Sequence, residues 1–406
     1  MSESTRRTPY KVPLNTSTVD AAEIAAAKAV LDSGHFTMGQ QCRTFEENFA
    51  AFLGVPHAIM VNSGSSANLL AAFALGNPLC PLTGGRRRLQ AGDEVIVPAL
   101  TWSTTVWPFV QAGAVPVFVD CDPEALQMQP TAIEAAIGPR TVAIAIVHVL
   151  GGAMDIAATR QIADRHGLWL FEDSCESLGV LWDGQQTGSF GDLASFSFYF
   201  AHHITTIEGG MVVTADPDIA DLLRALRAHG WARHMHSYQE QARANPQIDP
   251  RYLFVTTGFN VRPTEINAAI GLVQLQRLAG FNDRRRTIAA RLSDGLASMV
   301  RRGLLAPMQF DQRCRPAPFG YPVLCRSTDE RDGLRDALEG AGVETRPVIC
   351  GNLARQPALQ QVPHRVSGTL HGADAVMDRG LYWGTHPAMT DGEIGYIIDQ
   401  VIGFFS

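Results

Sequence analysis

The chain has 406 residues, of which 46% are apolar and 18% charged, and its formal net charge at neutral pH is −7. This length predicts about two or three domains. The apolar fraction excludes low-complexity disorder, and the mild negative charge disfavours a nucleic-acid-binding surface. Two short arginine runs, Arg86–Arg88 and Arg284–Arg286, are more typical of solvated faces than of binding sites.

The N-terminal segment is polar and lacks the apolar core of a signal peptide. The most apolar stretch, residues 141–158, is interrupted by polar residues and glycines, which predicts a buried strand and a turn rather than a membrane span. Seven scattered cysteines form no CxxC pair, so neither a metal site nor a disulfide framework is indicated. We therefore expect a cytoplasmic protein without membrane association.

Strand-like and helix-like segments alternate along the first three-quarters of the chain. A helix is expected over 19–33, capped by Ser17 or Thr18 and ended by Gly34. The other expected helices span 44–53, 67–75, 103–112, 130–137 and 157–166. Strands are expected at 57–61, 94–98, 115–119, 143–149, 169–172, 194–199 and 210–214. Strands joined by helices in this way predict a largely parallel sheet.

The last third of the chain begins with one long predicted helix, residues 263–299, with a possible kink near Gly280. Beyond it the pattern predicts strands at 318–325 and 343–348 and helices at 329–341 and 390–404. We therefore divide the chain into a large cofactor-binding domain, residues 1–280, and a small C-terminal α+β domain, residues 281–406.

The first motif with chemical content is Asn62-Ser63-Gly64-Ser65-Ser66-Ala67, between a strand and a helix. Small residues let the backbone approach an anion, and a helix N-terminus offers free N–H groups and a favourable dipole. A capped turn without a ligand is the alternative interpretation.

The second motif, Leu170-Phe171-Glu172-Asp173, takes a buried strand directly into acidic residues, and Glu176 follows. Ligands of open α/β sheets bind outside the carboxyl ends of the strands. A buried carboxylate at that place could pair with a protonated ring nitrogen, as in pyridoxal-phosphate enzymes. A helix N-cap or a Mg²⁺ ligand explains the acids equally well.

The third motif is a strand that alternates serine and phenylalanine over 195–198 and leads to His202 and His203. Adjacent side chains of an extended segment point to opposite sides, so at most one of these histidines is expected to face a given site.

Taken together and in this order, the three motifs resemble those of the DegT/DnrJ/EryC1/StrS sugar aminotransferase family. The resemblance covers nearly the whole chain, and further matching segments are Leu31-Asp32-Ser33, Val97-Pro98-Ala99, Asn260-Val261-Arg262-Pro263 and Arg346-Pro347. It implies an α/β protein with the pyridoxal-phosphate-dependent aspartate aminotransferase-like fold (fold type I).

In that family a lysine holds pyridoxal phosphate covalently at the place that His202 takes here. The chain contains only two lysines, Lys11 and Lys28, and neither is near this motif. The departure resembles the branch of sugar 3-dehydratases that act on GDP-4-keto-6-deoxymannose, in which histidine replaces the lysine. A second histidine branch uses an iron–sulfur cluster, but no cysteine lies between His203 and Cys314, so a four-thiolate cluster is not expected.

The resemblance also implies a role for each matching residue. His202 would be the acid and base, because Ser197 then keeps the family's phosphate-binding place five residues earlier, where His203 would leave Phe198. The implied contacts to non-covalent pyridoxamine or pyridoxal phosphate are Gly64, Ser65, Ser66, Trp102, Asp173, Glu176, Ser197 and, across a homodimer interface, Asn260. Substrate contacts are implied for His229, Arg233 and Arg262, for which structural ion pairs are the equally open alternative.

The implied reaction removes the C3 hydroxyl of a nucleotide-linked 4-keto-6-deoxy sugar and releases ammonia, with L-glutamate restoring the amine form of the cofactor. GDP as the nucleotide comes from the resemblance alone. Two alternatives stay open: a nucleotide-sugar 4-aminotransferase, and a catalytically inactive relative that senses sugar nucleotides. Lysine absence disfavours the first, and the joint presence of Asp173, Trp102 and His202 disfavours the second.

Overall fold

The computed structural model describes residues 10–406, and its largest element is a sheet of eight strands. In spatial order these are β1 (His57–Val61), β9 (Gly210–Thr214), β8 (Leu193–Ser197), β5 (Trp169–Asp173), β4 (Thr141–Val147), β2 (Glu94–Pro98), β3 (Val115–Val119) and β14 (Arg365–Val366). Strand β9 runs antiparallel to both of its neighbours, and every other pairing is parallel. The predicted, largely parallel sheet is thus confirmed.

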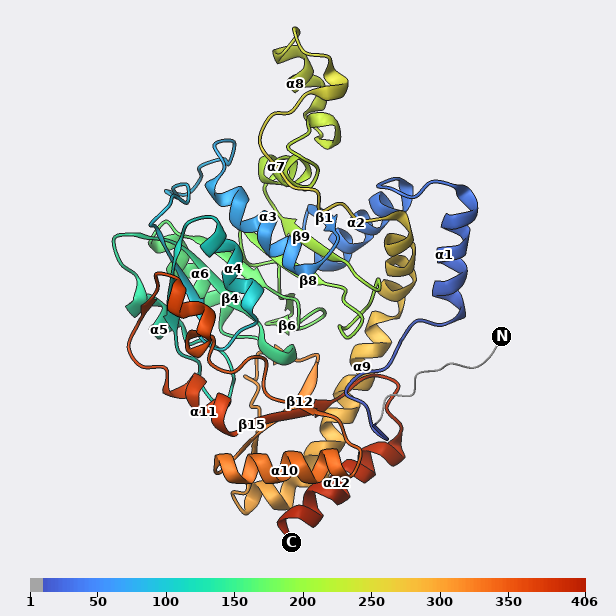
Figure 1. The fold of residues 1–406 in the computed structure, drawn as a ribbon, viewed down its shortest axis with the longest axis vertical. Helices are drawn as coiled ribbons and strands as arrows, with labels where there is room; N and C mark the ends of the chain where they lie inside the picture. The colour runs from blue at the N-terminus through green and yellow to red at the C-terminus, as the bar shows by residue number, and fades with distance from the viewer. Residues whose placement is uncertain (1–9) are drawn as a thin grey trace.

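Helices cover both faces of this sheet (Figure 1). They are α3 (Gly64–Gly76), α4 (Ser103–Gln111), α5 (Pro130–Ala136), α6 (Ile156–Arg165) and α7 (Pro217–Arg227). Alternate side chains of a strand point to opposite faces, so in β2 Val95 and Val97 join the core under α3 and α4. Ile96 joins the separate core under α5 and α6.

A second, antiparallel sheet forms at the other end of the molecule (Figure 1). Its strands in spatial order are β10 (Leu305–Pro307), β12 (Gly320–Cys325), β15 (Gly380–Gly384) and β13 (Thr345–Arg346). They share a core with α10 (Thr328–Gly340), α12 (Asp391–Phe405) and the end of α9 (Glu265–Arg301). Helix α9 runs unbroken through Gly280, and β14, from the C-terminal part of the chain, joins the large sheet. The division of the chain at residue 280 stays a prediction.

Two helix starts differ from the predicted ones for identifiable reasons. Helix α1 (Ala21–Ser33) is capped by Asp20, not by Ser17 or Thr18, and Glu23 completes a capping box. Helix α2 (Gln40–Leu53) begins four residues early because the Glu265 carboxylate accepts three backbone N–H groups of its first turn, at residues 39, 41 and 42. That cap comes from more than two hundred residues away, so no local pattern could reveal it.

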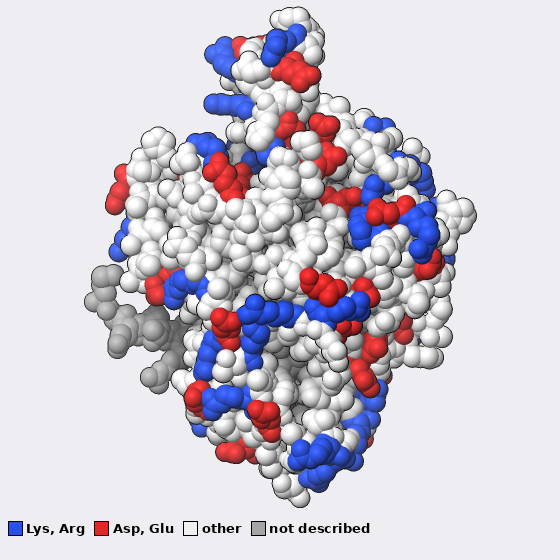
Figure 2. Space-filling view, turned by 180° about the vertical axis from the view of Figure 1, so that it is seen from behind, with Lys and Arg blue, Asp and Glu red and all other residues white. Residues whose placement is uncertain are grey.

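The remaining elements are short. They comprise the strands β6 (Leu181–Trp182), β7 (Gln185–Gln186) and β11 (Cys314–Arg315), the helices α8 (Tyr238–Ala244) and α11 (His371–Arg379), and the 3₁₀ turns η1 (Val149–Gly151), η2 (Ala232–His234), η3 (Pro250–Tyr252), η4 (Leu353–Arg355) and η5 (Pro357–Gln361). Helix α8 and its flanking loops project from the end of the molecule opposite the small sheet (Figure 1). Basic and acidic side chains are interspersed over the face seen in Figure 2. No helix among residues 10–406 is long and apolar enough to span a membrane.

Candidate active site

The carboxyl ends of the parallel strands meet at one edge of the large sheet and border a cavity of about 670 Å³. Strand β1 leads to Ser63, β5 ends at Asp173 and β8 ends at Ser197. The small domain closes the opposite side with Phe319, Arg346 and Tyr382. This is the place where open α/β sheets bind ligands.

The serine-rich loop after β1 forms the N-terminus of α3. Ser63 caps the helix, and its hydroxyl oxygen accepts the Ser66 N–H at 3.0 Å. Gly64 and Ser65 line the cavity, and the Ser65 hydroxyl donates to the Thr104 hydroxyl at 3.0 Å. Ser66 does not line it, because its hydroxyl faces Ser63 at 3.0 Å. The loop thus offers backbone N–H groups and the Ser65 hydroxyl to an anion.

Glycine is required at position 64 because the loop lies directly against β8. A Cβ there would stand 2.6 Å from the Ser197 Cβ and 3.0 Å from the Cys175 sulfur. Ser197 itself lines the cavity and accepts the Tyr199 N–H at 3.3 Å. The close approach leaves a narrow polar cradle between the loop and the strand end.

The Asp173 side chain is buried and held by three donors. Its Oδ2 accepts the Asn68 amide at 3.0 Å and the Thr105 hydroxyl at 2.8 Å, and its Oδ1 accepts the Cys175 N–H at 3.1 Å. Thr101 in turn donates to the Thr105 hydroxyl at 2.8 Å. Because Oδ2 already takes two donors, the lone pair left for a ligand is on Oδ1.

The His202 ring lies in the cavity wall with a defined tautomer. Its Nδ1 is 2.7 Å from the Cys175 carbonyl oxygen. A carbonyl only accepts, so Nδ1 carries the hydrogen and Nε2 keeps a free lone pair. Burial is the largest cause that lowers the pKa of His202 to about 4, and the Cys175 carbonyl and Asp173 partly oppose it. The imidazole is therefore neutral at neutral pH, with the Nε2 lone pair unprotonated.

His203 points away from this cavity, although β8 ends at Ser197 and the two histidines lie in a turn rather than in the extended segment that the sequence predicts. It is buried, and its Nε2 donates to the Ala317 carbonyl at 2.8 Å. Of the two adjacent histidines, only His202 lines the cavity.

Two further predicted residues lie in the same wall. Trp102, directly before α4, lines the cavity with 57% of its surface exposed, so a flat indole face is available for stacking. The Glu176 carboxylate accepts the Leu150 N–H at 2.9 Å, and burial raises its pKa to about 7. Glu176 is thus a carboxyl that can hold a proton near neutral pH.

The four remaining predicted residues gather elsewhere, on a surface that we call the arm surface: His229, Arg233, Asn260 and Arg262. The backbones of residues 228–229 and 259–260 are bonded to each other, and Arg262 donates to Asn260 at 2.9 Å. Asn62 donates its N–H to Val261, which brings this segment beside the serine-rich loop, yet none of the four side chains lines the 670 Å³ cavity.

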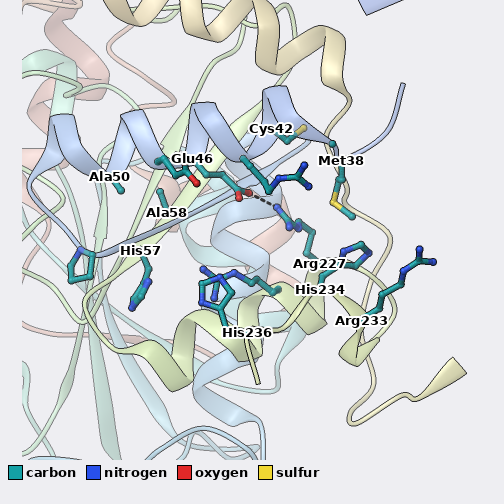
Figure 3. A pocket seen from close by; sticks show the side chains of 15 residues that line it. Met38, Cys42, Glu46, Ala50, His57, Ala58, Arg227, Arg233, His234 and His236 are labelled. Carbon is teal, nitrogen blue, oxygen red and sulfur yellow. Dashed lines mark hydrogen bonds and ion pairs between the residues drawn. The ribbon is translucent and has the colours of Figure 1, made fainter. Parts of the chain in front are cut away.

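A second pocket, of about 360 Å³, borders the arm surface and is drawn in Figure 3. Arg227 crosses it to Glu46 on α2 at 2.6 Å, while Arg233 lies at its outer rim. Burial is the largest cause that lowers the pKa of His234 to about 4, and Arg227, Arg233 and Arg262 contribute to the same shift. The lining of this pocket includes four arginines and two glutamates.

The sequence reasoning missed the residues that support the cavity from behind. Asn68 and Thr105 hold Asp173, and Glu344 pairs with Arg346 at 2.7 Å in the small-domain wall. Asn68 was visible as a lone polar residue inside the apolar helix 67–75. Among residues 10–406, no group of three His, Cys, Asp or Glu side chains is placed to hold a metal ion.

A helix-covered sheet with this cavity at its carboxyl edge, closed by a small antiparallel domain, is the aminotransferase-like fold of pyridoxal-phosphate-dependent proteins. The model of the DegT/DnrJ/EryC1/StrS aminotransferase family matches residues 17–402, and the chain belongs to that family of enzymes.

Relatives of the chain include named sugar dehydratases. The chain is 37% identical to dTDP-4-dehydro-2,6-dideoxy-D-glucose 3-dehydratase of Saccharopolyspora spinosa, over 94% of this chain and 83% of the relative. It is 34% identical to GDP-4-keto-6-deoxy-D-mannose 3-dehydratase of Yersinia pseudotuberculosis, over 94% and 95%. The solved structure of the Escherichia coli GDP-4-keto-6-deoxy-D-mannose 3-dehydratase with bound hydrated PLP superimposes with a TM-score of 0.88 at 34% identity, covering 97% of this chain and 99% of that one.

Proposed function

We propose that the protein is a pyridoxamine-phosphate-dependent 3-dehydratase of a nucleotide-linked 4-keto-6-deoxy sugar. The observation that carries the proposal is His202: an imidazole with a free Nε2 lines the cavity, and neither lysine does. Lys11 instead places its ammonium 3.4 Å from the centre of the Tyr396 ring, and Lys28 belongs to α1. An enzyme that holds its cofactor through lysine has no residue for that task here.

The cavity residues fit the cofactor. A phosphate suits the cradle that a Cβ at Gly64 would fill. The free N–H groups of α3 and the hydroxyls of Ser65 and Ser197 would donate to it. Oδ1 of Asp173 would accept a hydrogen bond from a protonated ring nitrogen. Trp102 would stack on the ring, and Glu176 would lie at its edge.

When bound, the amine form of the cofactor would supply an amine for the C4 ketone of the sugar and an electron-withdrawing ring. Nε2 of His202 would take and return a proton beside that ring, while Asp173 would keep a proton on the ring nitrogen. The C3 hydroxyl would leave with a proton as water, hydrolysis would release ammonia, and the product would be a 4-keto-3,6-dideoxy sugar. The two electrons that replace the hydroxyl would come from oxidation of the amine form to the aldehyde form. L-Glutamate would restore the amine form and end as 2-oxoglutarate, again with His202 as the proton carrier.

We further propose that the protein works as a homodimer in which each arm surface completes the partner's cavity. The side chains of His229, Arg233 and Asn260 are exposed, and none of the four arm residues lines the cavity of its own chain. Arginine forks suit phosphate oxygens, so Arg233 and Arg262 would bind the sugar nucleotide's diphosphate and Asn260 the cofactor phosphate.

The competing function is a nucleotide-sugar 4-aminotransferase, because the family is named for that activity. The decisive experiment incubates the purified protein with pyridoxamine phosphate, glutamate and a panel of GDP-, CDP- and dTDP-linked 4-keto-6-deoxy sugars. We expect ammonia and a 3-deoxy product from one nucleotide series, and neither from His202→Asn. An aminosugar without ammonia would refute the dehydratase and favour the aminotransferase.

A further inference from the structure

Three consecutive arginines of α9 have different surroundings. Arg284 donates to the Met389 carbonyl at 2.6 Å and pairs with Asp391 at 3.1 Å, and Arg286 pairs with Asp283. Arg285 is 1% exposed and, among residues 10–406, has no carboxylate partner. The interpretation of the run as a solvated face is therefore wrong for its middle residue.

The buried Arg285 guanidinium is poorly satisfied. Its Nη1 reaches the Pro318 and Phe319 carbonyls only at 3.4 and 3.3 Å, and its Nε has no hydrogen-bond partner. Burial lowers the pKa of Arg285 to about 10, which still leaves it charged at neutral pH. An unpaired buried charge costs stability, so packing alone does not explain this residue.

One aromatic ring, Phe319, packs near both this charge and His202. The Phe319 ring centre is 6.0 Å from the guanidinium carbon of Arg285 and 5.2 Å from the centre of the His202 ring. The same ring is 5.6 Å from His203. No carboxylate of residues 10–406 pairs with Arg285 to screen its field, and the ring itself adds little screening.

We propose that Arg285 is a positioning residue whose unpaired charge, packed against the same Phe319 ring as His202, adds to burial in disfavouring protonation of the His202 imidazole. The inference deepens the proposed function, on which it rests. It assigns the arginine to the proton transfer without contact to substrate or cofactor.

Groups on every side of His202 contribute to its field, and their signs show what Arg285 must oppose. The carboxylates that line the same cavity are Asp173, Glu176, Glu208 and Glu344, and the cation among its lining residues is Arg346. The Tyr199 ring packs at 6.2 Å. Burial disfavours a protonated imidazole most, Asp173 favours it, and Arg285 adds to the effect of burial.

The charge of Arg285 lowers the pKa of three neighbouring histidines. Arg285 lowers the pKa of His202, of His203 and of His386, in each case in addition to the larger effect of burial. Nδ1 of His203 is also buried and has no hydrogen-bond partner among residues 10–406. All three are therefore neutral, which is how an unpaired guanidinium can coexist with three imidazoles.

The test measures the titration of His202 by histidine NMR in the cofactor-free protein, with the resonance assigned through His202→Asn. Arg285→Met should raise the pKa of His202 by about 0.5–1 unit. Arg285→Lys stays charged below pH 7 and should raise the pKa of His202 by no more than about a third of that shift. Arg284→Met and Arg286→Met are matched controls that should not move it.

An unchanged His202 titration in Arg285→Met would overturn the inference, as would equal shifts in Arg285→Met and Arg285→Lys. Should Arg285→Met fail to fold, Arg285→Gln against Arg285→Lys gives the same comparison at similar size. The NMR readout needs no turnover, so failure of the dehydratase assay would refute the proposed function without touching this result. If turnover is observed, the acid limb of its pH profile should move upward in Arg285→Met only.

Discussion

The predicted site residues of the cavity and those of the arm surface differ in how they are held in place. In the cavity, Asp173 and Ser197 come from neighbouring strand ends of one sheet, and their contacts lie within the chain. On the arm surface, His229, Arg233 and Asn260 are exposed, and Arg262 and Asn260 bond mainly to each other. The first set is fixed by contacts within one chain, whereas the second is exposed and, in the proposed homodimer, would act in the partner's cavity.

This difference separates what a residue does in the cavity from what it does at the surface. Changes in the cavity should act on proton transfer and cofactor binding, and should do so within each chain. Changes on the arm surface should act on substrate binding and, if the sites are shared, on the partner chain.

The largest effect is expected from the adjacent histidines. His202→Asn should lower kcat by at least about 10²–10⁴-fold, because general acid–base catalysis is lost. His203→Asn should cost less than about tenfold, since its Nε2 only bonds the Ala317 carbonyl. Single-turnover product formation measures both, with the cofactor dissociation constant as a control. A reversed order would show that the base sits one residue later.

Asp173→Asn should slow turnover by about 100-fold or more while the melting temperature stays close to that of the wild type. The amide can no longer hold a proton on the ring nitrogen, although Asn68 and Thr105 keep their places around it. Near-normal kcat would show that Asp173 does not face that nitrogen.

The arm surface is tested by mixing a variant impaired in substrate binding with a variant impaired in proton transfer, at a substrate concentration well below the raised KM. Arg262→Ala should raise KM for the sugar nucleotide by about tenfold or more, because a charge-assisted contact to phosphate is lost. If sites are shared, re-associated mixtures of Arg262→Ala with His202→Asn should regain activity at about a quarter of the sites. Mixtures that stay inactive would place Arg262 in its own chain's site or outside catalysis.

The raised pKa of Glu176 predicts that the free energy of unfolding depends on pH. Its folded pKa of about 7 lies above the unfolded value of 4.5, so folding favours the protonated carboxyl. The stabilisation is complete below about pH 4.5 and is lost as the pH rises to about 7. Glu176→Gln should remove this loss. The free energy of unfolding of the variant, relative to that of the wild type, should therefore be higher at pH 8 than at pH 5 by about 1–2 kcal/mol. Denaturant unfolding at both pH values checks this, and an equal difference at both would contradict it.

The smallest effect is expected at Thr105, one of the three donors to Asp173. Thr105→Val should weaken pyridoxal phosphate binding by about fivefold, as one buried hydrogen bond is worth about 1 kcal/mol. Thr105→Ser should restore it. Thr104→Val, which removes only the contact to Ser65, is the neighbouring control, and identical losses in both would argue against a specific role of Thr105.

The central sheet and the cavity could be predicted from the sequence because the strands and the polar residues at their ends form local sequence patterns. Strands at 57–61, 94–98, 115–119 and 210–214 match the predicted bounds, and buried runs are hard to mistake there. The start of α2 was missed because its cap is supplied by Glu265, and the burial of Arg285 because a charge run says nothing about its neighbours in space. The Ser66 hydroxyl accepts from Ser63, a contact that the sequence pattern did not reveal, and Ser66 as a phosphate contact stays a prediction.

The anchor of His202 is a main-chain oxygen, the carbonyl of Cys175. Every amino acid carries that atom, so the orientation of the ring does not depend on which side chain stands at position 175. In evolutionary terms, an ancestor with lysine at position 202 could have gained a correctly oriented imidazole by replacing that one residue, without a compensating change beside it. Under the proposed function, a single substitution at position 202 would place a proton carrier in the cavity without a matching change at position 175.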